Sequence, residues 1–209
     1  MIYSFLNQKG GAGKTTLALN TAALLAQRGA RVLYIDADPQ ATSMSWSKIR
    51  EPEKLFTMVS ITTPTVHKEV RDLARAYQHV IIDGPPRVTD LARSVVMASD
   101  VVVIPIQPSP FDVWASDEIV RIVQESSVYK DSLKAVFAIN RRIKGTAIGR
   151  DVFEAIKDQP FPALQTAIAQ RVIYPESASA GLAVFEAAPK GPAAKEIAAF
   201  VDELLGAFA

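Results

Sequence analysis

The sequence predicts an α/β fold in which a mostly parallel, twisted sheet is flanked by helices. Two observations favour this fold. Short, β-branched apolar runs recur along the chain, and longer segments with apolar residues at helical spacing lie between them. Strands buried on both faces of a parallel sheet show such continuous apolar runs, without in/out alternation. Strand-then-helix repetition implies right-handed crossovers, which place ligands at the carboxyl ends of the strands.

The expected elements follow this alternation in order. The short apolar runs expected to be strands are residues 2–6, 31–35, 80–82, 101–106 and 135–139. The segments expected to be helices are residues 15–28, 64–77, 109–129 and 148–157. Prolines then divide the C-terminal part into short pieces before a final amphipathic helix, roughly residues 193–208. Because no repeat or linker composition interrupts this pattern, we expect residues 1–209 to form a single domain.

Composition excludes several classes of protein. The net charge of +1 gives no overall attraction to nucleic acid or to an anionic membrane. The absence of cysteine rules out disulfides, thiolate metal sites and iron–sulfur clusters. No apolar run approaches the roughly 20 residues of a membrane span, and the N-terminus lacks the basic lead of a signal peptide. We therefore expect a cytoplasmic protein that does not bind membranes.

A glycine-rich stretch joins the first expected strand to the first expected helix. It reads Asn-Gln-Lys-Gly-Gly-Ala-Gly-Lys-Thr-Thr over residues 7–16. Glycines at Gly10, Gly11 and Gly13 let backbone N–H groups close around a phosphate without side-chain clash. The start of the helix adds the positive end of its dipole. This context is that of a phosphate-binding loop, so the chain is predicted to bind ATP with magnesium.

Each remaining position of the loop has an expected role. Lys14 should reach the β- and γ-phosphate oxygens, and the Thr15 hydroxyl should coordinate magnesium. The residues expected to contact the nucleotide through this loop are Gly10, Gly11, Ala12, Gly13, Lys14, Thr15 and Thr16. The match to G-x-x-x-x-G-K-[ST] is incomplete, because Gln8 replaces the first glycine and an additional lysine, Lys9, precedes the glycine pair.

Acidic residues follow two of the expected strands. Asp36 and Asp38 come after the second strand, and Asp83 ends the third. An aspartate at a strand end beside the loop can hold magnesium, usually through water. Taken singly, each of them could instead be a turn or cap residue. Together with the loop, Asp36 and Asp83 are predicted to be metal-site residues along with Thr15.

These motifs resemble the deviant Walker A ATPases of the ParA/MinD superfamily. The resemblance rests on residues 9–16, 36–40 and 81–86, and it extends over almost the whole chain. Residues 46–48, 105–112 and 166–174 are similar to those of small ParF-type plasmid partition proteins, which lack an N-terminal DNA-binding domain. The resemblance implies a single P-loop NTPase domain that hydrolyses ATP slowly, forms a homodimer or longer polymers on ATP, and responds to a partner protein.

The resemblance also implies roles for single residues. Lys9 would cross a dimer interface to touch the partner's ATP, which agrees with the argument that one γ-phosphate does not need both Lys9 and Lys14 locally. Asp38 would position the attacking water, so that Lys9, Lys14 and Asp38 form the catalytic set. Asp83 would be the Walker B residue. Asn140 would read the adenine edge, although an asparagine that simply ends a strand is an equal alternative.

Relatives without a DNA-binding domain bind DNA non-specifically as ATP dimers, through basic residues of the C-terminal part. The candidates here are Arg171 and Lys190, and Arg141, Arg142 and Lys144 form a dense basic run. For each residue, a solvated surface charge is the alternative. Membrane binding is disfavoured because the polar face of the last helix carries more acid than base.

The expected function is an ATP-dependent partition ATPase that segregates plasmid or chromosomal DNA with a small centromere-binding or adaptor protein. Such a protein would be cytoplasmic and associated with the nucleoid. A positioning ATPase for a protein cargo, such as a microcompartment or a chemoreceptor cluster, would use the same switch. A small-molecule ATP-dependent synthetase on the same fold is the remaining alternative.

Overall fold

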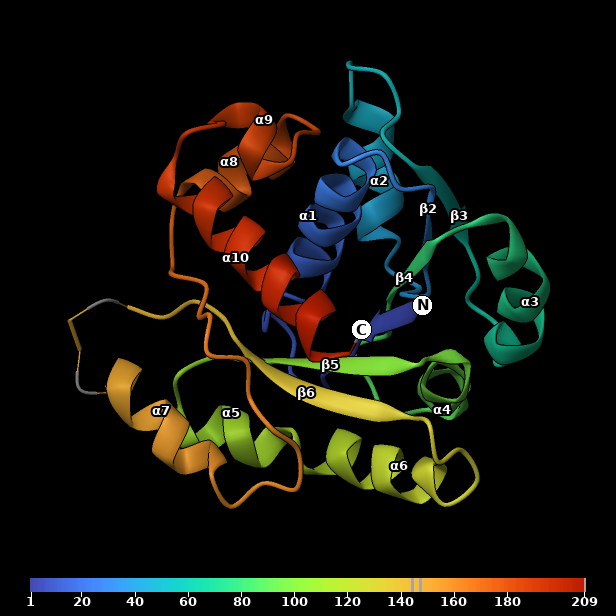
Figure 1. The fold of residues 1–209 in the computed structure, drawn as a ribbon, viewed down its shortest axis with the longest axis vertical. Helices are drawn as coiled ribbons and strands as arrows, with labels where there is room; N and C mark the ends of the chain where they lie inside the picture. The colour runs from blue at the N-terminus through green and yellow to red at the C-terminus, as the bar shows by residue number, and fades with distance from the viewer. Residues whose placement is uncertain (144, 147, 209) are drawn as a thin grey trace.

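The computed structural model describes residues 1–143, 145–146 and 148–208. Among these residues, six strands form one all-parallel sheet in the order β3-β2-β4-β1-β5-β6 (Figure 1). The strands are β1 Ile2–Phe5, β2 Val32–Asp36, β3 Thr57–Ser60, β4 His79–Asp83, β5 Val101–Ile106 and β6 Lys134–Ile139. The fold class predicted from the sequence is therefore confirmed.

Helices cover both faces of the sheet (Figure 1). One face is covered by α1 Lys14–Gln27, α2 Thr42–Ile49, α8 Ile173–Ser179, α9 Val184–Ala187 and α10 Pro192–Ala207. The other face is covered by α3 Val66–Leu73, the 3-10 helix η1 Ala74–Ala76, α4 Asp90–Ala98, α5 Pro110–Ala115, α6 Asp117–Ser127 and α7 Ile148–Ile156. The core thus lies in two layers, one on each side of the sheet.

The apolar strand sequences follow from this double burial. In β4, Val80 and Ile82 pack in the layer of α3, α4 and α6, whereas Ile81 packs in the layer of α1 and α10. Successive side chains of a strand point to opposite faces, and both faces are buried here. A strand in this position therefore needs an apolar residue at every step rather than at every second one.

Some elements differ from those expected. Strand β3 was not predicted, and residues 109–129 form two helices, α5 and α6, instead of one. These helices separate at the buried Ser116, whose hydroxyl donates to the Val113 carbonyl at 2.5 Å. Helices α2 and α4 form in segments for which no helix was predicted. Helices α8 and α9 lie in the short C-terminal pieces, and α10 is the final helix expected over roughly residues 193–208.

The sheet brings the loop and the acidic residues to one edge. Strand β4 lies between β2 and β1, so Asp83 is in register with Asp36 on one side and with Phe5 on the other. Phe5 ends the strand that leads into the glycine-rich loop. The chain proceeds to β2, β3 and β4 on one side of β1 and to β5 and β6 on the other. Ligands of open α/β sheets bind at such a reversal of strand order.

Within the described part of the chain, no helix is long and apolar enough to span a membrane.

Candidate nucleotide site

The glycine-rich loop has the backbone conformation that its glycines permit. Gly11 and Gly13 have φ angles of 77° and 93°, in the left-handed region that disfavours other residues. Gly13 is the N-cap of α1, so the N–H groups of the first turn of this helix point toward the loop. A Cβ atom on Gly13 would lie 2.0 Å from Nδ2 of Asn140. The loop is therefore shaped by its own glycines and by a side chain that follows β6.

A buried asparagine fastens this loop to the neighbouring strand. The Asn7 side chain donates from Nδ2 to the Pro105 carbonyl of β5 at 2.6 Å. Its Oδ1 accepts the Lys9 backbone N–H at 3.0 Å. Asn7 is fully buried, and no sequence argument singled it out. Because its side chain bonds to both strand β5 and the loop, Asn7 fixes where the loop begins.

Lys14 lies buried at the start of α1, against the acidic end of the sheet. Burial lowers the pKa of Lys14, and the nearby charges of Asp83 and Asp38 oppose that shift. Lys14 is 7% exposed, so most of its surface is withdrawn from water. The structure therefore places the predicted phosphate lysine beside two of the predicted acidic residues.

Asp83 is the carboxylate best suited to a cation. It is fully buried, and its Oδ1 has no hydrogen-bond partner among the residues that the structure describes. Burial raises the pKa of Asp83 to about 7, opposed by the hydroxyls of Thr15 and Ser43 and by the charge of Lys14. A buried carboxylate beside a phosphate-binding loop, with a free oxygen and a neighbouring threonine hydroxyl, has the oxygen chemistry that magnesium requires.

The described residues contain no group of three His, Cys, Asp or Glu side chains that could hold a metal ion by themselves.

Asp36 and Asp38 shape the turn that follows β2. The Asp36 carboxylate accepts the backbone N–H groups of Asp38 and Met44, each at 3.1 Å, and burial raises its pKa. Asp38 Oδ1 accepts the Gln40 N–H at 2.9 Å, and Ala41 adopts a left-handed φ of 52° before α2. Asp36 therefore holds the turn together, and Asp38 is buried in the same turn, with 8% of its surface exposed.

Ser43 of α2 is a site residue that sequence reasoning missed. Its hydroxyl donates to Asp83 Oδ2 at 2.9 Å and pairs with the Tyr34 hydroxyl at 2.8 Å. All three side chains are fully buried. Six polar or acidic residues lie within residues 36–45, and nothing in the pattern distinguishes Ser43 from the rest.

Replacing Ser43 with alanine is expected to destabilise the protein by about 1–3 kcal/mol, because Tyr34 and Asp83 would keep buried polar atoms without this partner. Chemical denaturation measures the change. Ser45→Ala is the matched control, since the Ser45 hydroxyl lies on the same helix, is exposed and bonds to the Ala41 carbonyl. Equal unfolding midpoints for the two variants would contradict the structural role of Ser43.

Lys9 extends from the loop to a buried carboxylate of α5. Its Nζ lies 2.5 Å from Asp112 Oδ2, and the side chains of Lys9 and Asp112 are 38% and 2% exposed. The second oxygen, Asp112 Oδ1, is buried and has no hydrogen-bond partner in the described residues. Asp112 lay inside a proline-rich segment noted in the sequence, but its pairing with Lys9 was not predicted.

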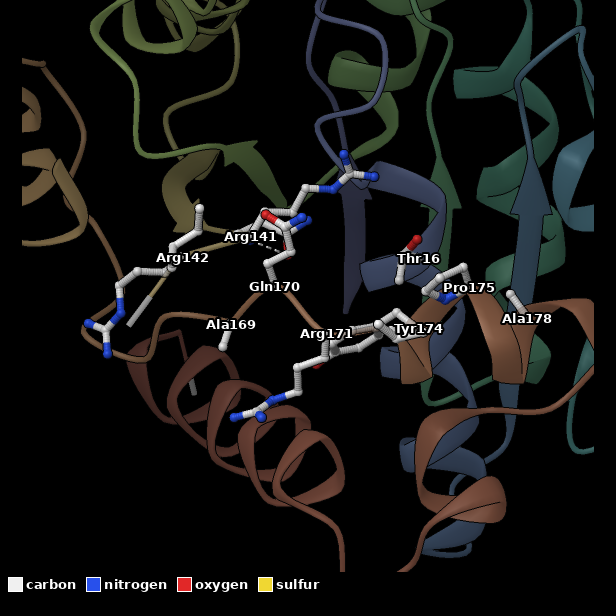
Figure 2. A pocket seen from close by; sticks show the side chains of 12 residues that line it. Thr16, Arg141, Arg142, Ala169, Gln170, Arg171, Tyr174, Pro175 and Ala178 are labelled. Carbon is white, nitrogen blue, oxygen red and sulfur yellow. Dashed lines mark hydrogen bonds between the residues drawn. The ribbon is translucent and has the colours of Figure 1, made fainter. Parts of the chain in front are cut away.

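A cavity of about 750 Å³ opens beside the start of α1 (Figure 2). Figure 2 shows side chains from the start of α1, from the end of β6 and from the segment leading into α8 around it. Its lining residues are Thr16, Asn140, Arg141, Arg142, Ile143, Ala169, Gln170, Arg171, Val172, Tyr174, Pro175 and Ala178. Adjacent to the phosphate-binding loop, this cavity has the position and size for the base and sugar of a nucleotide.

Asn140 lines this cavity, but its amide group already bonds to its own chain. Nδ2 donates to the Ala12 carbonyl of the loop at 2.8 Å, and Oδ1 accepts the Arg141 N–H at 2.9 Å. The contact seen is therefore with the loop itself. Reading of an adenine edge by Asn140 stays a prediction.

The basic candidates have different surroundings. Arg171 binds Glu196 of α10 through two contacts of 2.6 and 3.1 Å, and Figure 2 shows it turned toward that helix. Lys190 is exposed in the turn before α10 and has no ion pair with any described residue. Arg141 and Arg142 line the cavity. Lys144 lies outside the described residues.

Comparison with known proteins gives a family model, described as CobQ/CobB/MinD/ParA nucleotide binding domain, that matches residues 3–184. A Halothiobacillus neapolitanus protein named maintenance of carboxysome distribution protein A is 32% identical over 209 residues, covering 95% of this chain and 94% of its own. The sporulation initiation inhibitor protein Soj of Bacillus subtilis is 33% identical over 147 residues, covering 51% of this chain and 58% of its own.

Solved structures also match most of the chain. The structure of apo McdA from Cyanothece has a TM-score of 0.82 at 19% identity and covers 97% of this chain and 98% of its own. This likeness shows that the described sheet and its helices are arranged as in that protein. The geometry of the site and the match over residues 3–184 agree on a nucleotide as the ligand.

Proposed function

Since the chain belongs to the CobQ/CobB/MinD/ParA nucleotide-binding family, we propose that it is a magnesium-dependent ATPase that dimerises on ATP and positions a cargo with a partner protein. ParA- and MinD-type members of this family are P-loop ATPases. The observation that carries the proposal is the presence of two lysines in one loop. Lys14 is buried toward the acidic residues, whereas Lys9 extends out of the loop to α5.

The loop and the sheet edge supply the groups that ATP requires. The N–H groups at the start of α1 and the Lys14 ammonium bind the β- and γ-phosphates. Thr15 and Asp83 would hold magnesium, and Asp36 would support the site from the neighbouring turn after β2. When bound, that ion neutralises charge on the phosphate oxygens. Asp38, in the same turn, orients the water that attacks the γ-phosphate.

Lys9 is proposed to act on the nucleotide of a second copy. Its side chain lies against α5 rather than beside Asp83, so it is not part of the cluster that neutralises the local phosphates. A positive charge supplied from another chain stabilises transferring phosphate, as an arginine finger does. Helix α5 also presents Phe111 and Trp114, 71% and 63% exposed, with rings in edge contact at 5.5 Å. Exposed aromatic pairs are typical of protein interfaces.

The cargo has two candidates. Similarity to the carboxysome distribution protein spans 95% of this chain, which supports a protein assembly as the cargo. Similarity to the Soj protein of B. subtilis, over 51% of this chain, supports DNA partition. The first similarity covers nearly twice as much of the chain, so we place a protein assembly first and plasmid or chromosomal DNA second.

Non-specific DNA is proposed as the surface over which the ATP dimer distributes. Lys190, Arg141 and Arg142 are the candidates, and Arg171 would first have to leave Glu196. Two copies double the number of phosphate contacts, so that affinity for DNA depends on the nucleotide. Such a protein would be found in the cytoplasm, over the nucleoid.

DNA co-sedimentation with ATP, with ADP and without nucleotide tests this function across a salt series. We expect retention on DNA with ATP alone, and a steep fall as salt rises from 50 to 200 mM, roughly tenfold or more for a few phosphate contacts. Lys190→Ala should weaken retention, whereas Lys68→Ala, which removes an exposed charge from α3, should not. Equal retention in all nucleotide states would contradict the ATP switch. ATP-dependent phosphorylation of an added carboxylate substrate would favour a synthetase instead.

A further inference from the structure

Lys9, which is proposed to act on another chain, forms an ion pair with Asp112 of its own chain. The Asp112 side chain is 2% exposed, and Lys9 Nζ contacts its Oδ2 at 2.5 Å. The other oxygen has no partner in the described structure. The Lys9 ammonium group thus balances the charge of a carboxylate that is almost fully buried.

Removal of the lysine would leave this carboxylate buried without its counter-charge. Breaking a buried pair in that way is strongly unfavourable, because the remaining charge has neither solvent nor partner. Any state in which the Lys9 ammonium leaves Asp112 therefore carries this free-energy cost. A ligand that draws Lys9 away must therefore interact with it more strongly than Asp112 does.

The surroundings allow the lysine side chain to move while the loop stays in place. The Lys9 backbone N–H is fixed by Asn7 Oδ1, and Asn7 is itself fixed to Pro105. The Lys9 side chain is 38% exposed, so part of it is in contact with solvent. Asp112, in contrast, is held by α5, whose first turn is closed by a bond from its N–H to the Ser109 carbonyl.

We propose that Asp112 is a positioning residue that retains Lys9 on its own chain until the triphosphate of a second copy displaces the carboxylate. This inference rests on the proposed action of Lys9 between two chains. The γ-phosphate carries more negative charge than one carboxylate, whereas ADP lacks that group. Asp112 thereby sets how strongly a nucleotide must interact with Lys9 before a dimer forms, and this threshold favours ATP over ADP.

The ion pair itself is tested on the nucleotide-free protein. Asp112→Asn keeps the size of the side chain and removes its charge. We expect acylation of Lys9 by a water-soluble N-hydroxysuccinimide ester, measured by mass spectrometry, to rise several-fold in this variant relative to that of the exposed Lys195. Asp117→Asn, which neutralises an exposed aspartate at the start of α6, is the control and should leave labelling unchanged. Unchanged labelling of Lys9 in Asp112→Asn would overturn the proposal.

The threshold is tested by sedimentation velocity over a series of ATP and ADP concentrations. Asp112→Asn is expected to dimerise at about tenfold lower ATP, equivalent to about 1.4 kcal/mol, and to form detectable dimers with ADP. In a Lys9→Ala background the same change should have no effect on dimer formation. Faster labelling with an unchanged ATP midpoint would overturn the role in dimerisation.

The two proposals fail in different ways. If Lys9→Ala dimerises and hydrolyses ATP as the wild type does, the action of Lys9 on a second chain is wrong. If Lys9→Ala is defective but Asp112→Asn behaves as the wild type, the action between chains stands and the role of Asp112 is wrong.

Discussion

Replacing Lys14 with alanine is expected to weaken ATP binding by about 100-fold or more and to abolish ATP-induced dimerisation. The change removes the ammonium group of the buried Lys14, and with it charge-assisted bonds to the phosphates of about 1.5–3 kcal/mol each, where 1.4 kcal/mol is a factor of ten. It also removes from Asp83 and Asp38 the nearby positive charge of Lys14. Calorimetric titration with Mg-ATP and light scattering measure the two effects.

Lys195→Ala is the matched control, because it removes the same charge from the exposed surface of α10. This variant should bind ATP as the wild type does. Circular dichroism establishes that both variants are folded. ATP-induced dimerisation of folded Lys14→Ala at wild-type concentrations would contradict the assignment of the phosphate site.

Asp38→Ala is expected to bind ATP but to turn it over about 100-fold more slowly, so that the protein accumulates as a dimer. Asp38 lies in the turn before α2, and a group that orients and activates water contributes about 10²–10⁴-fold to rate. The ATP dimer then persists because it leaves that state by hydrolysis. Phosphate release and the lifetime of the dimer, followed by light scattering, test the prediction.

Asp38→Asn separates catalysis from the shape of the turn. It retains an oxygen that can accept the Gln40 N–H, so the turn keeps its 2.9 Å bond while the carboxylate charge is lost. If the charge matters, Asp38→Asn is as slow as Asp38→Ala. Recovery of wild-type turnover in Asp38→Asn would show that Asp38 acts through the turn alone.

The elements predicted from the sequence are those with unambiguous burial. Strands β1, β4, β5 and β6 are apolar at nearly every position because helices cover both of their faces. Strand β3 lies at the edge of the sheet, and its Thr57 and Ser60 are exposed, so no apolar run marked it. The break between α5 and α6 depends on a local bond of Ser116, which apolar spacing does not reveal.

The candidate site divides in the same way. The phosphate-binding loop and Asp83 were predictable because their residue types and their place at strand ends carry the chemistry. Ser43 and Asp112 were not, since each matters through a residue distant in the sequence, Asp83 and Lys9 respectively. The same limit applied to Arg171, whose pairing with Glu196 brings together two segments that the pattern leaves unrelated.

The close approach of Gly13 to Asn140 links the residue types that two distant parts of the chain can accept. A side chain at residue 13 would meet Nδ2 of Asn140 at 2.0 Å, and Asn140 in turn holds the Ala12 carbonyl. The φ of 93° at residue 13 already disfavours a side chain there, and a Cβ would in addition displace the Asn140 amide that holds the loop. We therefore expect residue 13 to remain glycine among relatives of this chain, and the residue after β6 to be constrained by its contact with the loop.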